Sequence, residues 1–191
     1  MSHEQTAAAF AEATASVAEV VREAAEADLG APTPCGDWDL GALLRHFAGT
    51  SGAFAAAAEG ALDADDPWGG RVELAPDWSA QLGGNLDRAG AGWSQPATWS
   101  SEIGNSSMPT AAVGEMGLIE IVLHGWDLAR ATGQSVSLSA ETAAEVLRCA
   151  AATAEQGREY EVYGPAVEIP ANASDLDKAL GLTGRDPAWS A

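Results

Sequence analysis

Apolar residues recur at helical spacing along most of the chain. The pattern predicts five long helices, covering about residues 4–28, 39–60, 78–93, 110–131 and 139–156. Asp39 is a good N-cap, Ser139 suits the start of the fifth helix, and Gly133 follows the fourth as a C′ glycine. Strand formers are sparse and the connections are short to moderate, so the sequence favours an all-α helical bundle.

The last segment, from about residue 157, has a different pattern. Pro165, Pro170 and Pro187 predict extended or looped chain, and residues 174–184 predict one short helix. A length of 191 residues fits one domain. We therefore expect residues 1–191 to form a single domain, a bundle with an extra C-terminal helix and a partly extended tail that packs on it.

The composition excludes several classes of partner. The formal net charge is −19, from 28 acidic and 9 basic residues, and such a surface repels phosphate backbones and anionic lipid. No apolar run approaches the ~20 residues that a membrane span needs, and the N-terminus lacks the basic region of a signal peptide. Two cysteines make no disulfide framework. These features predict a cytoplasmic protein without nucleic acid or membrane partners.

One helix carries ionisable groups where its pattern demands burial. In "GLIEIVLHGWDLARATG", residues 117–133, Glu120, His124 and Asp127 lie within an arc of about 60° among apolar side chains. Buried acids are costly unless they are paired or bound to metal. Because Glu120 and His124 stand one turn apart, both can reach one ion. The alternative is a simple hydrogen-bonded pair.

His46, on the second predicted helix, is the candidate for a third ligand. It falls at the edge of the apolar stripe of that helix, away from Arg45, so we expect it in or beside the core. A structural histidine is the alternative. His46, Glu120 and His124 together offer two imidazoles and one carboxylate, a set that suits Zn²⁺, with Ni²⁺ or Fe²⁺ as alternatives, and leaves open positions for water or substrate.

Asp127 and Arg185 are candidates for supporting roles. Asp127 follows His124 by about one turn and is expected either to support this ligand from behind or to form a salt bridge with Arg45 or Arg130. The salt bridge is the preferred interpretation. Arg185 is expected to anchor the tail by binding acids or carbonyls, rather than to bind substrate.

Two tryptophans and two cysteines complete the candidates. Trp38 and Trp126 adjoin the two ligand-bearing segments and are candidates for a pocket wall, although core packing is the simpler interpretation. Cys35 precedes a helix start but has no histidine neighbour in sequence, so a packing role is preferred over a nucleophile. Cys149 lies in an apolar helix and is expected in the core.

Two segments resemble a known family. "APTPCGDWDLGALLRHFAG" and "EIVLHGWDLARATGQ" are similar to signature blocks of an actinobacterial metal-binding family of the DinB-like superfamily, related to the N-terminal domain of mycothiol-dependent maleylpyruvate isomerase. The tail "GPAVEIP…GRDPAW" is also similar to that group. The resemblance implies an up-down four-helix bundle and a divalent metal held at His46, Glu120 and His124. It also implies a low-molecular-weight thiol as a partner, since relatives with known activity use mycothiol or bacillithiol as cosubstrate in isomerisation or S-transfer.

The resemblance leaves two departures and three functional alternatives. The isomerase carries a separate C-terminal domain, whereas this chain ends soon after Trp189, and Gly41 stands where a larger polar residue is expected. The leading hypothesis is a metal-dependent isomerase or thiol S-transferase that acts on a small electrophile. The alternatives are a metal-binding protein that acts without thiol, by activating water or polarising a carbonyl, and a non-catalytic binding module. A monomer or homodimer is expected.

Overall fold

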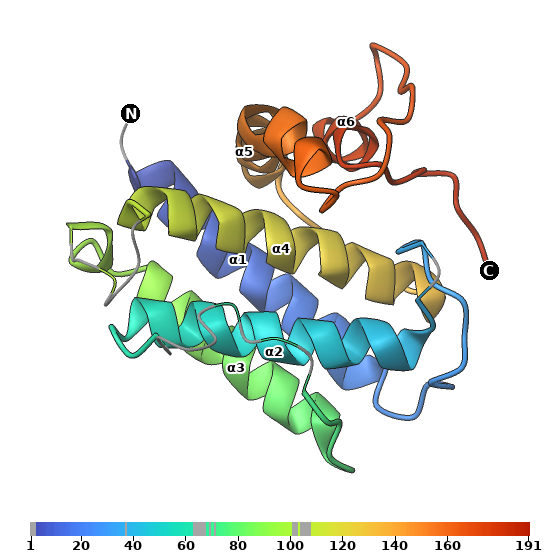
Figure 1. The fold of residues 1–191 in the computed structure, drawn as a ribbon, viewed down its shortest axis with the longest axis horizontal. Coiled ribbons are helices and arrows are strands. Elements are labelled where there is room, and N and C mark those ends of the chain that lie inside the picture. The colour runs from blue at the N-terminus through green and yellow to red at the C-terminus, as the bar shows by residue number, and fades with distance from the viewer. Residues whose placement is uncertain are drawn as a thin grey trace.

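The computed structural model describes residues 3–36, 38–62, 68, 70, 72–100, 103 and 108–191. Within these ranges all named elements are helical (Figure 1). They are α1 (His3–Glu23), α2 (Leu40–Ala58), α3 (Trp78–Trp93), the short 3-10 helix η1 (Thr98–Ser100), α4 (Thr110–Ala131), α5 (Ala140–Glu159) and α6 (Asp175–Leu182). The predicted all-α bundle is confirmed, and α6 is the extra C-terminal helix.

The residues predicted to begin and end helices have these roles in the structure. Asp39 accepts a hydrogen bond from the Ala42 amide at 2.7 Å, and Ser139 caps α5 in the same way. Gly133 has φ +70°, the left-handed conformation that follows many helix ends. Gly41 has a packing role, because a Cβ there would lie 3.3 Å from the carbonyl oxygen of Leu29.

Helices α1 to α4 form a bundle in which α1 and α2 each pack between α3 and α4. The helices α2 and α3 run parallel: Asn85 donates to the carbonyl of Ala48 at 3.2 Å, and Gly92 lies against Ala58 further along both helices. The connection over 59–77 therefore leads back along the bundle. As a result α1 and α4 point one way, and α2 and α3 the other.

Helix α4 is covered on several sides, by α1, α2 and α5. Two of its glycines allow this close packing. A Cβ on Gly117 would lie 2.8 Å from the Phe54 ring, and a Cβ on Gly125 would lie 2.4 Å from the Val17 side chain. Close approach on several sides explains why apolar residues surround nearly the whole circumference of this helix.

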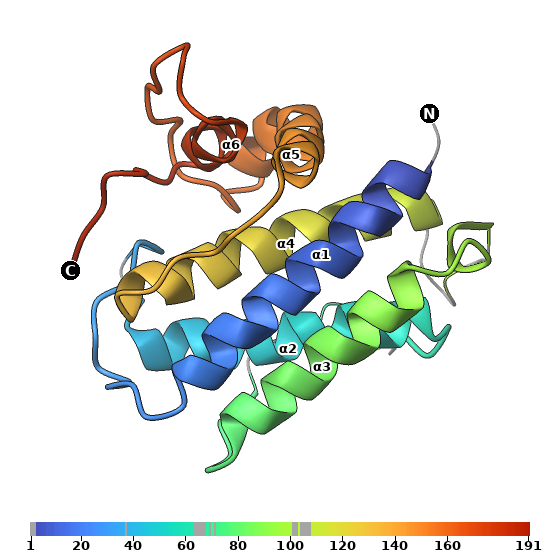
Figure 2. The same cartoon turned by 180° about the vertical axis from the view of Figure 1, so that it is seen from behind.

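Helices α5 and α6 form a separate layer beside the bundle (Figures 1 and 2). Helix α5 packs on α1 and α4, and α6 packs on α5. The chain before α6 folds back on it: the Val167 amide donates to the Gly181 carbonyl at 2.9 Å, and a Cβ on Gly181 would meet Ile169 at 2.2 Å. None of the described helices has the length and apolar character that crossing a lipid bilayer requires.

Candidate metal centre

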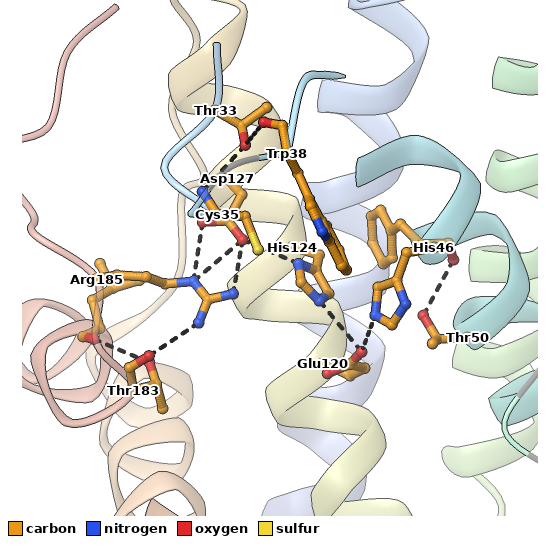
Figure 3. Close-up of polar contacts among 12 residues, drawn as sticks. Thr33, Cys35, Trp38, His46, Thr50, Glu120, His124, Asp127, Thr183 and Arg185 are labelled. Carbon is orange, nitrogen blue, oxygen red and sulfur yellow. Dashed lines mark hydrogen bonds and ion pairs between the residues drawn. The ribbon is translucent and has the colours of Figure 1, made fainter. Parts of the chain in front are cut away.

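Three side chains from two helices converge at one point. His46 comes from α2, and Glu120 and His124 come from successive turns of α4 (Figure 3). Oε1 of Glu120 lies 2.9 Å from Nε2 of His46 and 3.3 Å from Nε2 of His124. The candidate ligand atoms of all three residues lie within 4.8 Å of one another. The fold therefore brings together the three residues that were predicted from the sequence, although His46 and Glu120 are 74 positions apart in the chain.

A buried acid supports the second imidazole from behind. Nδ1 of His124 lies 3.0 Å from Oδ2 of Asp127, and because a carboxylate only accepts hydrogen bonds, Nδ1 carries a proton in this contact. Asp127 is fully buried. This hydrogen bond fixes the ring so that Nε2 faces Glu120 and His46, the orientation that a metal ligand needs.

Asp127 is itself held by the tail. Arg185 donates from Nε to Oδ1 of Asp127 at 3.0 Å and from Nη2 to Oδ2 at 2.8 Å, and its Nη1 donates to the Thr183 carbonyl at 3.3 Å. Arg185 is 7% exposed. The predicted role of Arg185 in anchoring the tail thus agrees with the structure.

The salt bridge predicted between Asp127 and Arg45 or Arg130 is wrong. Arg185, which follows α6, takes that place, and Asp127 also binds His124 of its own helix. Arg130 points its guanidinium at the tail as well, where Nε donates to the Trp189 carbonyl at 3.0 Å. The partner of Asp127 is 58 residues away in sequence, beyond what helical spacing can indicate.

One of the two predicted wall tryptophans is at the site. The Trp38 ring lies 5.0 Å from His46 and 6.2 Å from His124, centroid to centroid, and covers both imidazoles (Figure 3). Trp126 takes the preferred role of core packing: its ring is buried beside the Arg130 guanidinium, 5.9 Å away, and is not in the cavity wall that the described residues form. Two residues beyond His124, it points to another face of α4.

A cavity of about 590 Å³ opens above the three candidate ligands. Its floor is His46, Glu120 and His124, and one side is formed by residues 34–36 and Trp38. The other side is formed by residues 161–164 and 183–185 of the tail. Glu161, in this wall, has φ +57°, a conformation that costs a non-glycine residue energy and recurs at functional sites.

Burial and charge shift the pKa values of the cluster in opposite directions. Burial alone would raise the pKa of Glu120, but the charge of His124 and the hydrogen bonds from both imidazoles lower it overall. Burial alone would lower the pKa of His124, but the Glu120 charge and the hydrogen bond to Asp127 raise it well above 6.5. Both shifts favour an ion pair in which a protonated His124 lies between the Glu120 and Asp127 carboxylates.

This donor set fits a divalent cation. Two imidazoles and one carboxylate point at a common position, and a cation there would replace the proton on His124 Nε2 as the partner of Glu120. A second cluster, Cys35, His124 and Asp127, also has candidate atoms within 4.8 Å. It is less suited to a cation, because both Asp127 oxygens already bind the positive charge of Arg185.

The sequence did not reveal that Cys35 lines the cavity beside His124, because the two are far apart in the chain. Residue spacing could not have found this contact. Cys149, by contrast, is fully buried in the core as predicted, and burial raises the pKa of its thiol to about 12.

Comparison with known proteins shows the family of this chain. Residues 10–129, well over half of the chain, match the family described as mycothiol maleylpyruvate isomerase N-terminal domain. The chain belongs to this family. The match includes all three candidate ligands and Asp127, whereas Arg185 lies beyond it. The family assignment agrees with the resemblance seen in the two sequence blocks.

Two similar proteins come from strains of Mycobacterium tuberculosis. Uncharacterized protein MT0763, from strain CDC 1551 / Oshkosh, and uncharacterized protein Rv0738, from strain ATCC 25618 / H37Rv, are each 32% identical to this chain over 165 residues. Each alignment covers 86% of this chain and 82% of the relative. No solved structure gave a significant match.

Proposed function

We propose that the protein is a divalent-metal-dependent enzyme that activates a low-molecular-weight thiol, mycothiol in the first instance, for attack on a small electrophile. The reaction would be an isomerisation or an S-transfer. The observation that carries the proposal is the convergence of His46, Glu120 and His124 at the floor of a cavity. The family name, which refers to a mycothiol-dependent isomerase, supports the thiol as cosubstrate.

The residues have distinct roles in this proposal. His46, Glu120 and His124 would hold the ion, with Zn²⁺ proposed and Ni²⁺ or Fe²⁺ as alternatives. When bound, the cation would supply the Lewis acidity that keeps a thiol deprotonated at neutral pH. A divalent cation carries two positive charges, and of its three proposed ligands only Glu120 is negative. The centre would therefore keep one net positive charge and favour an anionic ligand.

The protein around the ligands would orient reactants and exclude water. Asp127 fixes the tautomer of His124 through the 3.0 Å contact at Nδ1. The Trp38 ring covers both imidazoles on one side, and Leu123 adds apolar surface to the cavity. A cavity of about 590 Å³ has the size typical of small-molecule sites.

Metal analysis tests the first half of the proposal. Purified protein should bind about one Zn²⁺ per chain, measured by mass spectrometry of the eluted metal, and H124A should lose it. The matched control is H3A, because His3 lies on α1 and stacks on Trp99 rather than at the candidate metal centre. If wild-type protein binds no divalent ion stoichiometrically, the metal centre is refuted.

Thermal denaturation of the zinc-loaded protein with mycothiol tests the second half. Mycothiol at a hundredfold excess over its Kd should stabilise the protein by about 2.7 kcal/mol, which raises the Tm by several degrees. H124A without metal should show no such shift. An unchanged Tm in zinc-loaded wild type would reject thiol chemistry and leave a metal centre that acts on water or a carbonyl.

A further inference from the structure

A chain of three buried residues joins the C-terminal tail to the candidate metal centre. Arg185 binds both oxygens of Asp127, and Asp127 in turn holds Nδ1 of His124 (Figure 3). Asp127 is fully buried, Arg185 is 7% exposed and His124 is 6% exposed. None of these contacts is therefore a solvated surface pair whose contribution water would remove.

The same tail residues form part of the cavity. Thr183, Gly184 and Arg185 line it directly, together with residues 161–164. Since α6 packs on α5, these residues meet α4 through side-chain contacts such as the Arg185–Asp127 pair. Docking of the tail on α4 and completion of the cavity wall are thus one structural event.

We propose that Arg185 is a positioning residue for the metal centre, and that metal binding and docking of residues 183–185 on α4 are thermodynamically coupled through Asp127. This inference rests on the metal centre proposed above. In this arrangement a docked Arg185 fixes the plane of the Asp127 carboxylate, and the carboxylate in turn fixes the orientation of the His124 ring. Without Arg185, the buried carboxylate would lose its charge partner and its orientation.

The size of the coupling follows from general behaviour of metal sites. Loss of an outer partner of a metal-bound histidine typically costs 10–100-fold in metal affinity. Because coupling between two binding events is reciprocal, the metal should stabilise docking of the tail by the same factor. The bidentate fork of an arginine is specific, so lysine should restore the charge without restoring the geometry.

Zinc affinity of variants is the first test. Competition with a chromophoric chelator should give R185Q and R185K affinities about 10–100-fold below wild type. The matched control is R130Q, since Arg130 also ties the tail to α4 but donates to the Trp189 carbonyl, whereas Arg185 donates to Asp127. R130Q should bind zinc as wild type does. The visible spectrum of the Co²⁺ form should change in R185K and not in R130Q.

Hydrogen exchange is the second test, and its first comparison, of wild-type protein with and without zinc, needs no variant to fold. Zinc should slow amide exchange in residues 161–164 and 183–185 about 10–100-fold. The zinc effect should disappear in R185K and persist in R130Q. The first test measures the effect of the tail on zinc affinity, and the second measures the effect of zinc on docking of the tail.

Three results would overturn the proposal. R185K and R185Q that bind zinc as tightly as wild type would show that Arg185 does not position His124. Exchange of residues 183–185 that is independent of zinc would show that docking is uncoupled. Both results leave the metal centre intact, whereas a wild-type protein that binds no zinc removes the centre and the coupling with it.

Discussion

At the scale of single residues, His124 is the side chain on which the site depends. One ring nitrogen faces Glu120 and the other faces Asp127, so burial does not deprive either nitrogen of a partner. In the metal-free protein both partners favour the protonated ring. A metal must therefore displace a proton from Nε2 before it can bind there.

The first prediction concerns pH. Because the folded pKa of His124 is raised above 6.5, its contribution to metal-free stability is fully present below pH 6.5 and is lost as pH rises through the folded pKa. Over the same window, zinc affinity should rise with pH. Calorimetry of zinc binding at pH 7, in two buffers of different ionisation enthalpy, should detect about one proton released per ion. An affinity that does not change between pH 6 and pH 8 would contradict this.

The second prediction concerns the buried ion pair. D127N leaves the Arg185 guanidinium buried without its counter-charge, and should lower the free energy of unfolding of metal-free protein by about 3–5 kcal/mol in a urea titration. The control is E59Q, which breaks the exposed pair between Glu59 and Arg88 and should cost at most about 1 kcal/mol. Equal effects of the two substitutions would show that the Asp127 pair is not the stronger one.

At the scale of elements, most helix boundaries were accessible from sequence, although α1 ends at Glu23 and not near residue 28 as predicted. Asp39 and Ser139 are N-caps in the structure, and Gly133 has the positive φ that its position predicts. The orientation of α4 about its own axis was harder to predict. Its residues are buried nearly all round, so periodicity separated the face of His124 from that of Trp126 but could not tell which face borders the cavity.

The third prediction tests the close packing of α4. Alanine is a better helix former than glycine by about 1 kcal/mol, yet G125A should destabilise the protein by about 1–3 kcal/mol, because its Cβ would lie 2.4 Å from Val17. The control is G84A in α3, where no atom lies within 4 Å of the added Cβ, and it should stabilise the protein by up to about 1 kcal/mol. Chemical denaturation distinguishes the two, and a stabilising G125A would show that α4 can move away from α1.

At the scale of the whole molecule, the fold class and the three converging residues were within reach of the sequence. The parallel course of α2 and α3 was not, because helical periodicity carries no information on direction. The contact of Arg185 with Asp127 was equally hidden: many acids could have paired with this arginine, and only the docking of the tail selects one.

The fourth prediction is that metal binding stabilises the entire fold. Zinc at a thousandfold excess over its Kd should add about 4.1 kcal/mol to the free energy of unfolding, equivalent to a rise in Tm of roughly 8–16 °C for a chain of this size. A chelator should reverse the rise. H46A should show none, whereas H3A should respond as wild type does. A wild-type Tm that is insensitive to zinc would contradict a site shared by α2 and α4.

The origin of the cavity wall in the tail has an evolutionary consequence. The floor of the cavity, formed by the three candidate ligands, lies inside the family-matched region, residues 10–129, while the facing wall is encoded after it. Ligand preference can thus diverge through replacement of a short stretch of gene, while the three candidate ligands stay unchanged. A chimaera that carries residues 157–191 of a relative should inherit the donor's selectivity and keep the recipient's ion chemistry.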